Sequence, residues 1–524
     1  MKEKVDLIVY NAIVYTVDSS FTTHSAFAVK DGKFVKIGKD EEIINLYTAS
    51  KYLDAEGNAL FPGFNDAHAH LFSLGESLKE VDLRGIDSFE KLLDKVTEAS
   101  KIKGVKIVIG HGWDQNLWEG QEFPDNKSLN ERVQNVPVIL NRIDYHAVLV
   151  NQKAIDLLGI KLLDGSYPHE EAIIVNGEFS GIFLENSAER FKEIIPESDL
   201  KDLYKTISLA QTECFKNGLT SVSTAGENLD KIRVLERFQK EGKLKLKVDL
   251  WLSANSENTS TFKRPYREGN LNVSALKLYI DGALGSRGAL MKLPYSDDRD
   301  NRGIKVIQDT VFRNYLKWAY ENGFQVATHC IGDEAVHIAL KEYGAILKTK
   351  NDKRWRIEHA QTVDPNDLNL FSKYSIIPSV QPTHATSDMI WAVERLGSRI
   401  TNAYINKELL DQNGWIPSGT DFPIEEVSPI NTFYSAVFRK NSNGYPDGGF
   451  QMQSALSREE AIRSMTIWAA KASFEEDLKG SIEVGKAADF VLLDTDLIKA
   501  SEGEVKEAKV LNTFVNGSEV YTSK

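Results

Sequence analysis

The 524-residue sequence predicts an α/β protein with a (β/α)₈ barrel, an inserted α/β subdomain and a small β-sandwich domain. Three observations predict it: strand-like segments at both chain ends, a repeating helix–strand rhythm from about residue 200, and a long interruption after the first barrel strand. Strands that alternate with helices form a parallel sheet covered by helices, and eight such units close into a barrel.

The two chain ends have the same strand-like sequence pattern. Near the start, VDLIVYNAIVYTVD and SAFAVKDGKFVKIGKD carry β-branched and aromatic residues broken by Asp-Gly, which is a hairpin signal. Near the end, GSIEVGKAADFVLLDTDLI and AKVLNTFVNGSEVYTSK again alternate and turn at glycine. We expect residues 1–58 and 476–524 to form one composite β-sandwich domain. Terminal hairpins that pack separately on the main domain are the alternative.

The barrel is expected over residues 59–475. Its first strand enters GFNDAHAH, and later strands follow helical segments, as TSVSTAG follows DLKDLYKTISLAQTECFKNG and FQVATHCIG follows TVFRNYLKWAYENG. VSALKLYIDGAL is a strand without a long helix before it. Residues 71–197 interrupt the series with strand-like runs of their own, VKIVIGHGW and VPVILNRIDYHAVLV. We interpret them as an α/β subdomain inserted over the barrel mouth.

Composition limits the function classes. Hydrophobic residues make up 42% and charged residues 27%, which is typical of a soluble globular protein. The net charge of −13 disfavours nucleic acid and anionic membranes as partners. Cys214 and Cys330, the two cysteines, exclude a disulfide framework. Without an apolar span or a signal-peptide pattern, we expect a cytoplasmic protein that acts on a small molecule.

The first barrel strand ends in Asp66-Ala67-His68-Ala69-His70. Residues two apart project from one face of a strand, so His68 and His70 are expected to point together at the C-terminal end of the barrel, where barrel enzymes keep their sites. Neutral imidazoles side by side suit a divalent metal. A His-X-His pair alone is weak support, because surface strands carry such pairs by chance.

Three further strand ends offer the same chemistry. FQVATHCIG ends at His329, RWRIEHAQ at His359, and WIPSGTDFP at Asp421. Each has a structural alternative, since a strand-end histidine can bond to a backbone group and an aspartate can cap a turn. Taken together with the first strand, they predict a metal centre at the C-terminal end of the barrel.

Lys277 lies on the strand ALKLYIDG, where alternation places it on the inward face with Tyr279 and Asp281. Burial disfavours the charged form of a lysine, and a neutral amine can react with CO₂ to give a carbamate that bridges two metals. An ion pair with Asp281 or another acid is the alternative.

These motifs in this order, PGFNDAHAH, the strand lysine, THCIGDEA, RIEHAQ and SGTDFP, resemble the amidohydrolase superfamily of metal-dependent hydrolases. GHGWDQNLW, NRIDYHAVLVN, KLYIDGALGSRGA and SVQPTHA resemble the subgroup that includes N-substituted formamide deformylase. The resemblance covers nearly the whole chain.

The resemblance implies a ligand set. His68, His70 and Asp421 would hold the first metal, and His329 and His359 the second. Lys277, as N6-carboxylysine, would bridge them, although superfamily members differ here and a one-metal centre stays open. Zinc is the first expectation, and iron and manganese accept the same ligands.

The expected reaction is hydrolysis of an amide-type C–N bond, linear or cyclic, with an N-substituted formamide as one candidate substrate. Metal-bound hydroxide would attack the carbonyl carbon, and Asp421 would act as general base and then general acid. His384, in QPTHA, could donate to the developing oxyanion.

Substrate contacts are expected from two stretches, each with a structural role as the alternative. They comprise Tyr279, Asp281 and Arg287 beside the strand lysine, and Trp113, Asp114, Arg142 and His146 in the insertion.

Other functions use the same ligands. A deaminase or an ester or carbamate hydrolase is the alternative enzyme, and a non-catalytic scaffold is a remote one because the full ligand set is present. The resemblance also admits a homodimer, although the residues reveal no dimer face.

Overall fold

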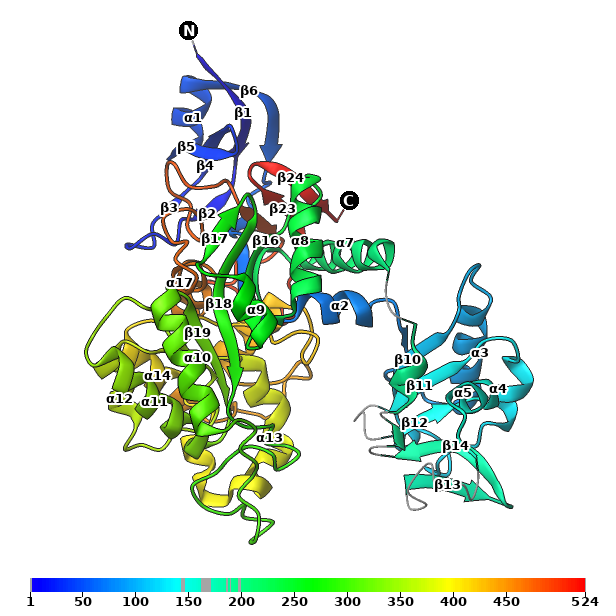
Figure 1. Ribbon diagram of the computed structural model, residues 1–524. Helices are drawn as coiled ribbons and strands as arrows, with labels where there is room; N and C mark the ends of the chain where they lie inside the picture. The colour runs from blue at the N-terminus through cyan, green and yellow to red at the C-terminus, as the bar shows by residue number, and fades with distance from the viewer. Residues whose placement is uncertain are drawn as a thin grey trace. The chain divides into compact units, whose positions relative to one another are not determined.

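The computed structural model describes residues 2–142, 147–161, 171–184, 187–188, 190–196 and 199–523. By its internal contacts the chain divides into two compact units, Met1–Leu74 with Ile207–Lys524, and Gly75–Thr206. The first unit carries the barrel and the strands from both chain ends, and the second carries the insertion (Figure 1).

Seven parallel strands form a nearly closed barrel in the first unit. Their order around the sheet is β8 (Phe64–Ala69), β15 (Leu219–Glu227), β16 (Lys247–Ser253), β18 (Leu271–Tyr279), β19 (Gln325–Cys330), β20 (Arg356–His359) and β21 (Ile377–Ser379). This confirms the expected parallel barrel. A short strand, β17 (Tyr266–Glu268), pairs antiparallel with β18.

The expected eighth strand is a short segment that closes the barrel between β21 and β8. Ser418 forms a single parallel bridge with Val380 on one side and accepts a hydrogen bond from the Ala67 amide, at 3.1 Å, on the other. Further along, the Asp421 amide donates to the His68 carbonyl at 2.8 Å. The His70 amide donates to the Phe422 carbonyl at 2.9 Å, and on the other side the Val380 amide donates to Pro417 and the Gly419 amide to Val380. This seam is therefore closed by backbone hydrogen bonds on both sides.

Amphipathic helices follow the barrel strands. In α10 (Asp309–Asn322), Phe312, Leu316 and Ala319 recur at helical spacing and are buried, and the helix ends at Gly323 in the left-handed conformation with φ +75°. The strand β18 follows only a short helix, α9 (Ser256–Thr261), as expected. The others are α7 (Leu200–Lys216), α8 (Leu229–Lys240), α11 (Asp333–Leu347), α12 (Leu368–Tyr374), α13 (Pro382–Leu396), α14 (Asn406–Asn413), α15 (Pro429–Phe438), α16 (Arg458–Ser464) and α17 (Ile467–Ala472). None of the described helices combines the length and apolarity needed to cross a membrane.

Strands from both chain ends share one sheet, and the blue and red ribbons of Figure 1 lie together. Its order is β24 (Ser518–Thr522), β23 (Val510–Val515), β22 (Phe490–Leu493), β7 (Ala59–Pro62), β2 (Ile13–Tyr15) and β3 (Thr23–His24). A second sheet has the order β5 (Lys33–Gly38), β4 (Ala26–Lys30), β1 (Glu3–Tyr10) and β6 (Tyr47–Asp54), with α1 (Asp40–Leu46) beside it. Phe27 and Phe34 from one end share a core with Phe490 and Phe514 from the other. The shared sheet extends to Pro62, past the expected boundary at residue 58.

The second unit has its own mixed sheet, with the order β13 (Ala172–Val175), β14 (Glu178–Leu184), β12 (Ala147–Val150), β11 (Val138–Arg142), β10 (Val108–Trp113) and β9 (Val81–Asp82). The helices α3 (Phe89–Ser100), α4 (Lys127–Arg132) and α5 (Gln152–Leu158) belong to it. The unit runs from Gly75 to Thr206, where residues 71–197 were expected, and its first residues belong to α2 (Leu71–Ser77), which begins in the other unit. Its expected place over the barrel mouth stays a prediction.

Candidate metal centre

The first strand brings two imidazoles to one acid. His68 lies in β8 and is buried, and His70 follows directly after the strand. Their ring centroids are 5.6 Å apart, and both Nε2 atoms face Oδ1 of Asp421, at 3.5 Å from His68 and 3.1 Å from His70. The spacing of two residues therefore gives the two rings a common target.

Two other members depend on unusual backbone. His359 and Asp421 both have left-handed φ values, +72° and +61°, which non-glycine residues rarely adopt. In β20 strict alternation would send His359 away from the face of Glu358, but the left-handed turn brings its ring to 5.0 Å from His68 and 4.6 Å from His329. Backbone strain of this kind concentrates at functional sites.

His68, His359 and Asp421 form a candidate metal-binding triad. One ligand atom from each lies within 4.8 Å of the others, and all three residues are buried. His70 and His329 adjoin the triad through their contacts with Asp421 and His359. All five strand-end residues expected at the metal centre are thus brought to one place.

Lys277 reaches the same centre. Its side chain is buried, and its Nζ lies 3.3 Å from Nε2 of His68. Burial lowers the lysine pKa to about 8. Asp281, the acid considered as its partner, is engaged elsewhere: its carboxylate accepts hydrogen bonds from the backbone amides of Leu290, Ile331 and Gly332.

The protonation of these groups suits a cation. Burial lowers the pKa of His68 to about 4 and that of His329 to about 3, and it holds the pKa of His359 well below its usual value. The imidazoles are therefore neutral at pH 7. For Asp421 burial acts to raise the pKa, but the surrounding histidines, His68 first, hold it well below the ordinary value, so the carboxylate is charged.

The fit to a divalent metal follows from where the lone pairs lie. His68 Nδ1 is bonded to Glu358 and His359 Nδ1 to Gln381 Oε1, at 2.7 Å, so each ring turns its other nitrogen away from these partners. Asp421 Oδ1 is buried without a hydrogen bond of good geometry in the described part of the chain, although His70 Nε2 is 3.1 Å away. Neutral imidazole nitrogens and a carboxylate that lack donors are the ligands that zinc and similar metals take.

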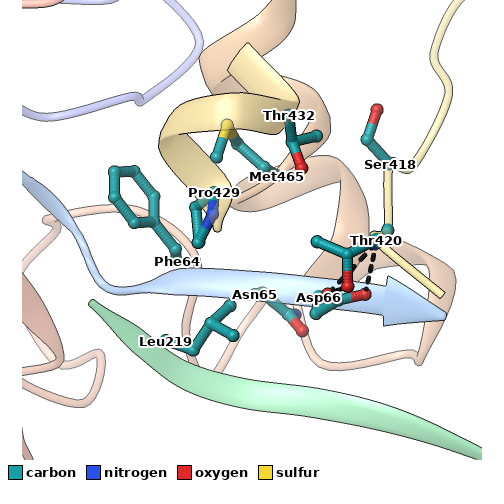
Figure 2. Close-up of a pocket in the computed structure, with 10 residues that line it drawn as sticks. Phe64, Asn65, Asp66, Leu219, Ser418, Thr420, Pro429, Thr432 and Met465 are labelled. Atoms are coloured by element: carbon teal, nitrogen blue, oxygen red, sulfur yellow. Dashed lines mark hydrogen bonds between the residues drawn. The ribbon is translucent and has the colours of Figure 1, made fainter. Parts of the chain in front are cut away.

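Asp66 fastens the first strand to the closing segment (Figure 2). Its carboxylate accepts hydrogen bonds from the Thr420 hydroxyl at 2.6 Å, the Thr420 amide at 3.1 Å and the His68 amide at 3.1 Å. Asp66 and Thr420 line a small cavity of ≈ 10 Å³. The aspartate thus ties together the segments that carry His68 and Asp421.

The expected substrate contacts in the first unit differ in their surroundings. His384, near the start of α13, has Nε2 3.8 Å from Asp421 Oδ2, and that nitrogen is buried without a hydrogen-bond partner among the described residues. Tyr279 is 43% exposed, with its ring 5.5 Å from that of His329. Arg287 forms an ion pair with Asp297 at 2.9 Å.

The expected contacts in the second unit have partners within it. Trp113 is buried in that unit's core and donates from its ring nitrogen to the Leu140 carbonyl at 2.7 Å. Arg142 pairs with Asp114 at 3.1 Å. His146 lies outside the described residues. The role of these side chains toward a substrate stays a prediction.

Sequence reasoning gave no role to Glu358, Arg356 or Gln381. All three are buried and contact the ligands directly or through one neighbour. The signal in RWRIEHAQ was two opposite charges at alternating positions of a short strand that precedes a ligand. Such a pair in a barrel strand faces the interior, where a charge must be matched.

Known proteins are similar to this chain over nearly its whole length. The model described as "Amidohydrolase family" matches residues 51–521. The chain is 29% identical to putative amidohydrolase YtcJ of Bacillus subtilis, over 98% of each chain, and 24% identical to N-substituted formamide deformylase of Arthrobacter pascens, over 99% of this chain and 98% of that one. The crystal structure of an uncharacterized metal-dependent hydrolase from Pyrococcus horikoshii superposes with a TM-score of 0.80 at 30% identity, covering 95% of this chain and 99% of that one.

Proposed function

The chain belongs to the amidohydrolase family, and on that premise we propose that it hydrolyses an amide-type C–N bond, linear or cyclic, in a small molecule. The observation that carries the proposal is the buried triad His68, His359 and Asp421. One ligand atom from each lies within 4.8 Å of the others, and Asp421 Oδ1 has no hydrogen bond of good geometry among the described residues. The likeness to a formamide deformylase makes N-substituted formamides the first substrates to test.

His68, His70 and Asp421 would hold one divalent metal, and His329 and His359 a second, with zinc as the first expectation. When bound, such metals supply a Lewis acid and lower the pKa of water toward 7. Lys277 is proposed to bridge them as N6-carboxylysine. Its buried Nζ, 3.3 Å from His68 Nε2, and its lowered pKa support this, since only the neutral amine reacts with CO₂.

Asp421 is proposed to move the proton. Its Oδ1 lacks a hydrogen bond of good geometry and its carboxylate is charged, so it can accept a proton from water and pass it to the leaving nitrogen. Its left-handed backbone fixes the carboxylate between His70 and His384, which restricts it to one orientation.

His384 is proposed to stabilise the developing oxyanion. Its Nε2, which has no hydrogen-bond partner among the described residues, is 3.8 Å from Asp421 Oδ2 and can donate to a carbonyl oxygen bound nearby. Tyr279, half-exposed beside Lys277 and His329, is the first candidate to contact the substrate's substituent.

Elemental metal analysis of the purified chain, with Lys277→Ala alongside, tests this proposal. We expect about two equivalents of metal per wild-type chain, as a two-metal site requires, and a sharp fall in the variant. One equivalent that is unchanged in Lys277→Ala would remove the bridge from the mechanism. A metal-loaded protein that hydrolyses esters or deaminates heterocycles, but leaves matched amides and formamides intact, would overturn the assignment of the bond.

A further inference from the structure

We propose that Glu358 is a positioning residue that holds His68 as the tautomer protonated at Nδ1, so that the Nε2 lone pair faces the metal position. The inference rests on the proposed metal centre and adds a residue to which the sequence motifs gave no role. It also assigns Arg356 as the group that holds Glu358 in its orientation.

The contact between Glu358 and His68 determines where the ring proton lies. Oε2 of Glu358 is 2.5 Å from Nδ1 of His68, and both side chains are buried. A carboxylate only accepts hydrogen bonds, so the proton of this short bond belongs to Nδ1. A neutral imidazole with a proton on Nδ1 has its lone pair on Nε2, the atom that faces Asp421 and Lys277.

Arg356 fixes the carboxylate. Its Nε lies 2.5 Å from Glu358 Oε1, and its Nη2 lies 3.2 Å from Oε2, which is the two-pronged geometry that arginine forms with carboxylates. The same Nη2 is bonded to the Ala67 carbonyl and the Ser379 hydroxyl, both at 2.8 Å. Arg356 is therefore anchored to β8 and β21, and Glu358 cannot rotate without breaking both of its bonds to this guanidinium.

His359, the other buried histidine of the triad, has a neutral hydrogen-bond partner at Nδ1. His359 Nδ1 is bonded to Gln381 Oε1, a neutral amide oxygen, at 2.7 Å, whereas His68 Nδ1 is bonded to a carboxylate. A carboxylate that accepts the outer N–H of an imidazole raises the basicity of the opposite nitrogen. His68 is thus the stronger donor of the two, and Glu358 is the cause.

A purely structural role for Glu358 would give a different experimental result from the positioning role proposed here. If Glu358 served only to neutralise Arg356, its loss would lower stability and leave the metal environment of the folded protein unchanged. Glu475 provides the matched control, because it is also a buried glutamate of the first unit and pairs with Arg267 and Lys479, neither of which contacts the candidate ligands.

Cobalt titration of the full chain tests the inference. Wild type, Glu358→Gln and Glu475→Gln are freed of metal and titrated with Co²⁺, and the visible absorption of the bound ion is recorded. For Glu358→Gln we expect affinity weaker by about 10–100-fold and a shifted absorption band, as for other losses of such partners. Glu475→Gln should bind cobalt as wild type does, even if it unfolds at a lower temperature.

Wild-type affinity and spectrum in Glu358→Gln would overturn the inference, as would an equal loss in Glu475→Gln. If Glu358→Gln does not fold, the double variant Glu358→Gln/Arg356→Met removes the unpaired guanidinium, and the same shift is expected in it. A wild-type chain that gives no cobalt signal would overturn the proposed metal centre and this inference together, while a normal wild type with an unchanged variant overturns this inference alone.

Discussion

Two buried polar clusters lie at opposite ends of the barrel strands, and their charges are balanced in different ways. The metal-end cluster at the C-terminal ends comprises His68, His70, Lys277, His329, His359 and Asp421. The strand-start cluster at the N-terminal ends comprises Lys247, Asp249, Glu475, Lys479 and Asp489. The strand-start cluster joins parts of the fold through ion pairs, whereas the metal-end cluster contains the candidate metal-binding triad.

In the strand-start cluster, charges meet opposite charges. Glu475 lies 2.6 Å from both Lys479 and Arg267, and Lys247 forms an ion pair with Asp489. The last pair joins a barrel strand to the loop before β22, so it also ties the barrel to the sheet built from both chain ends. These pairs match each charge with an opposite charge inside the protein. Glu475 Oε2, 2.6 Å from Lys479, nevertheless has no hydrogen bond of good geometry among the described residues.

The two buried aspartates show the contrast most directly. Asp249 accepts hydrogen bonds from Ser274 at 2.5 Å, Asn272 at 2.8 Å and the Trp251 ring nitrogen at 2.8 Å. Asp421 is surrounded instead by imidazole nitrogens, and its Oδ1 accepts no well-formed bond among the described residues. A buried acceptor without donors is costly unless a cation supplies the missing interaction.

The largest effect is expected from Asp421→Asn. The amide keeps the shape but cannot take up the proton, so turnover should fall by about 10²–10⁴-fold, the usual worth of a positioned acid–base group. Steady-state rates on the best amide substrate, with circular dichroism to verify the fold, measure it. Activity near that of wild type would remove Asp421 from proton transfer.

Lys479→Met should lower the free energy of unfolding and leave the metal content of the folded protein unchanged. Removing one partner of a buried ion pair costs about 3–5 kcal/mol, because the remaining charge is left without compensation. Urea unfolding gives the loss, and metal analysis of the folded protein gives the control. Metal loss in the folded variant would show that the two clusters are not independent.

Thr420→Val tests the hydrogen bonds between Thr420 and Asp66, which join the segments that carry Asp421 and His68. The substitution removes the hydroxyl that donates to Asp66 at 2.6 Å and keeps the hydrogen bond from the backbone amide of residue 420 to the same carboxylate. The same hydroxyl accepts from the Phe422 amide at 3.0 Å, which would lose its partner. We expect the free energy of unfolding to fall by about 1–3 kcal/mol, the cost of a buried donor left unsatisfied. Thermal unfolding measures it, and an unchanged midpoint would mean that the backbone alone holds Asp66.

The smallest expected effect is a change in acid sensitivity. Burial acts to raise the pKa of Glu475, but Lys479 and Arg267 outweigh it and hold the pKa below the ordinary value of 4.5. The stability that this carboxylate contributes is present above pH 4.5 and is lost as the pH falls through the lowered pKa. The urea midpoint of Glu475→Gln should therefore decline less steeply with acid than that of wild type. If the urea midpoints of wild type and Glu475→Gln declined in parallel as the pH fell, this expectation would be wrong.

The sequence predicted much of the barrel because periodicity and strand-end chemistry are local signals. His68 and His70 illustrate this, since a spacing of two residues is sufficient to give them a common target. The contacts of Glu358 were beyond reach, because its partner His68 is 290 residues away in the chain. The orientations of His359 and Asp421 were also beyond reach, because they depend on left-handed backbone at single residues, which periodicity does not encode.

The second unit marks another limit. Its strands were visible in the sequence, yet Trp113 proved to fill a core and Arg142 to pair with Asp114. These contacts leave the role of both side chains toward a substrate a prediction, because a side chain with a structural partner can still contact a substrate. His384 differs from them, since its Nε2 has no hydrogen-bond partner among the described residues.

The closing segment of the barrel has a dynamic consequence. Three backbone hydrogen bonds join it to the first strand, from the Ala67 amide to Ser418, from the Asp421 amide to His68 and from the His70 amide to Phe422. Both histidines of the first strand are therefore tied by their backbone to the segment that carries Asp421. A local fluctuation that opened this seam would separate the acid from both imidazoles at once, and faster solvent exchange of the amide hydrogens around Ser418 would report it.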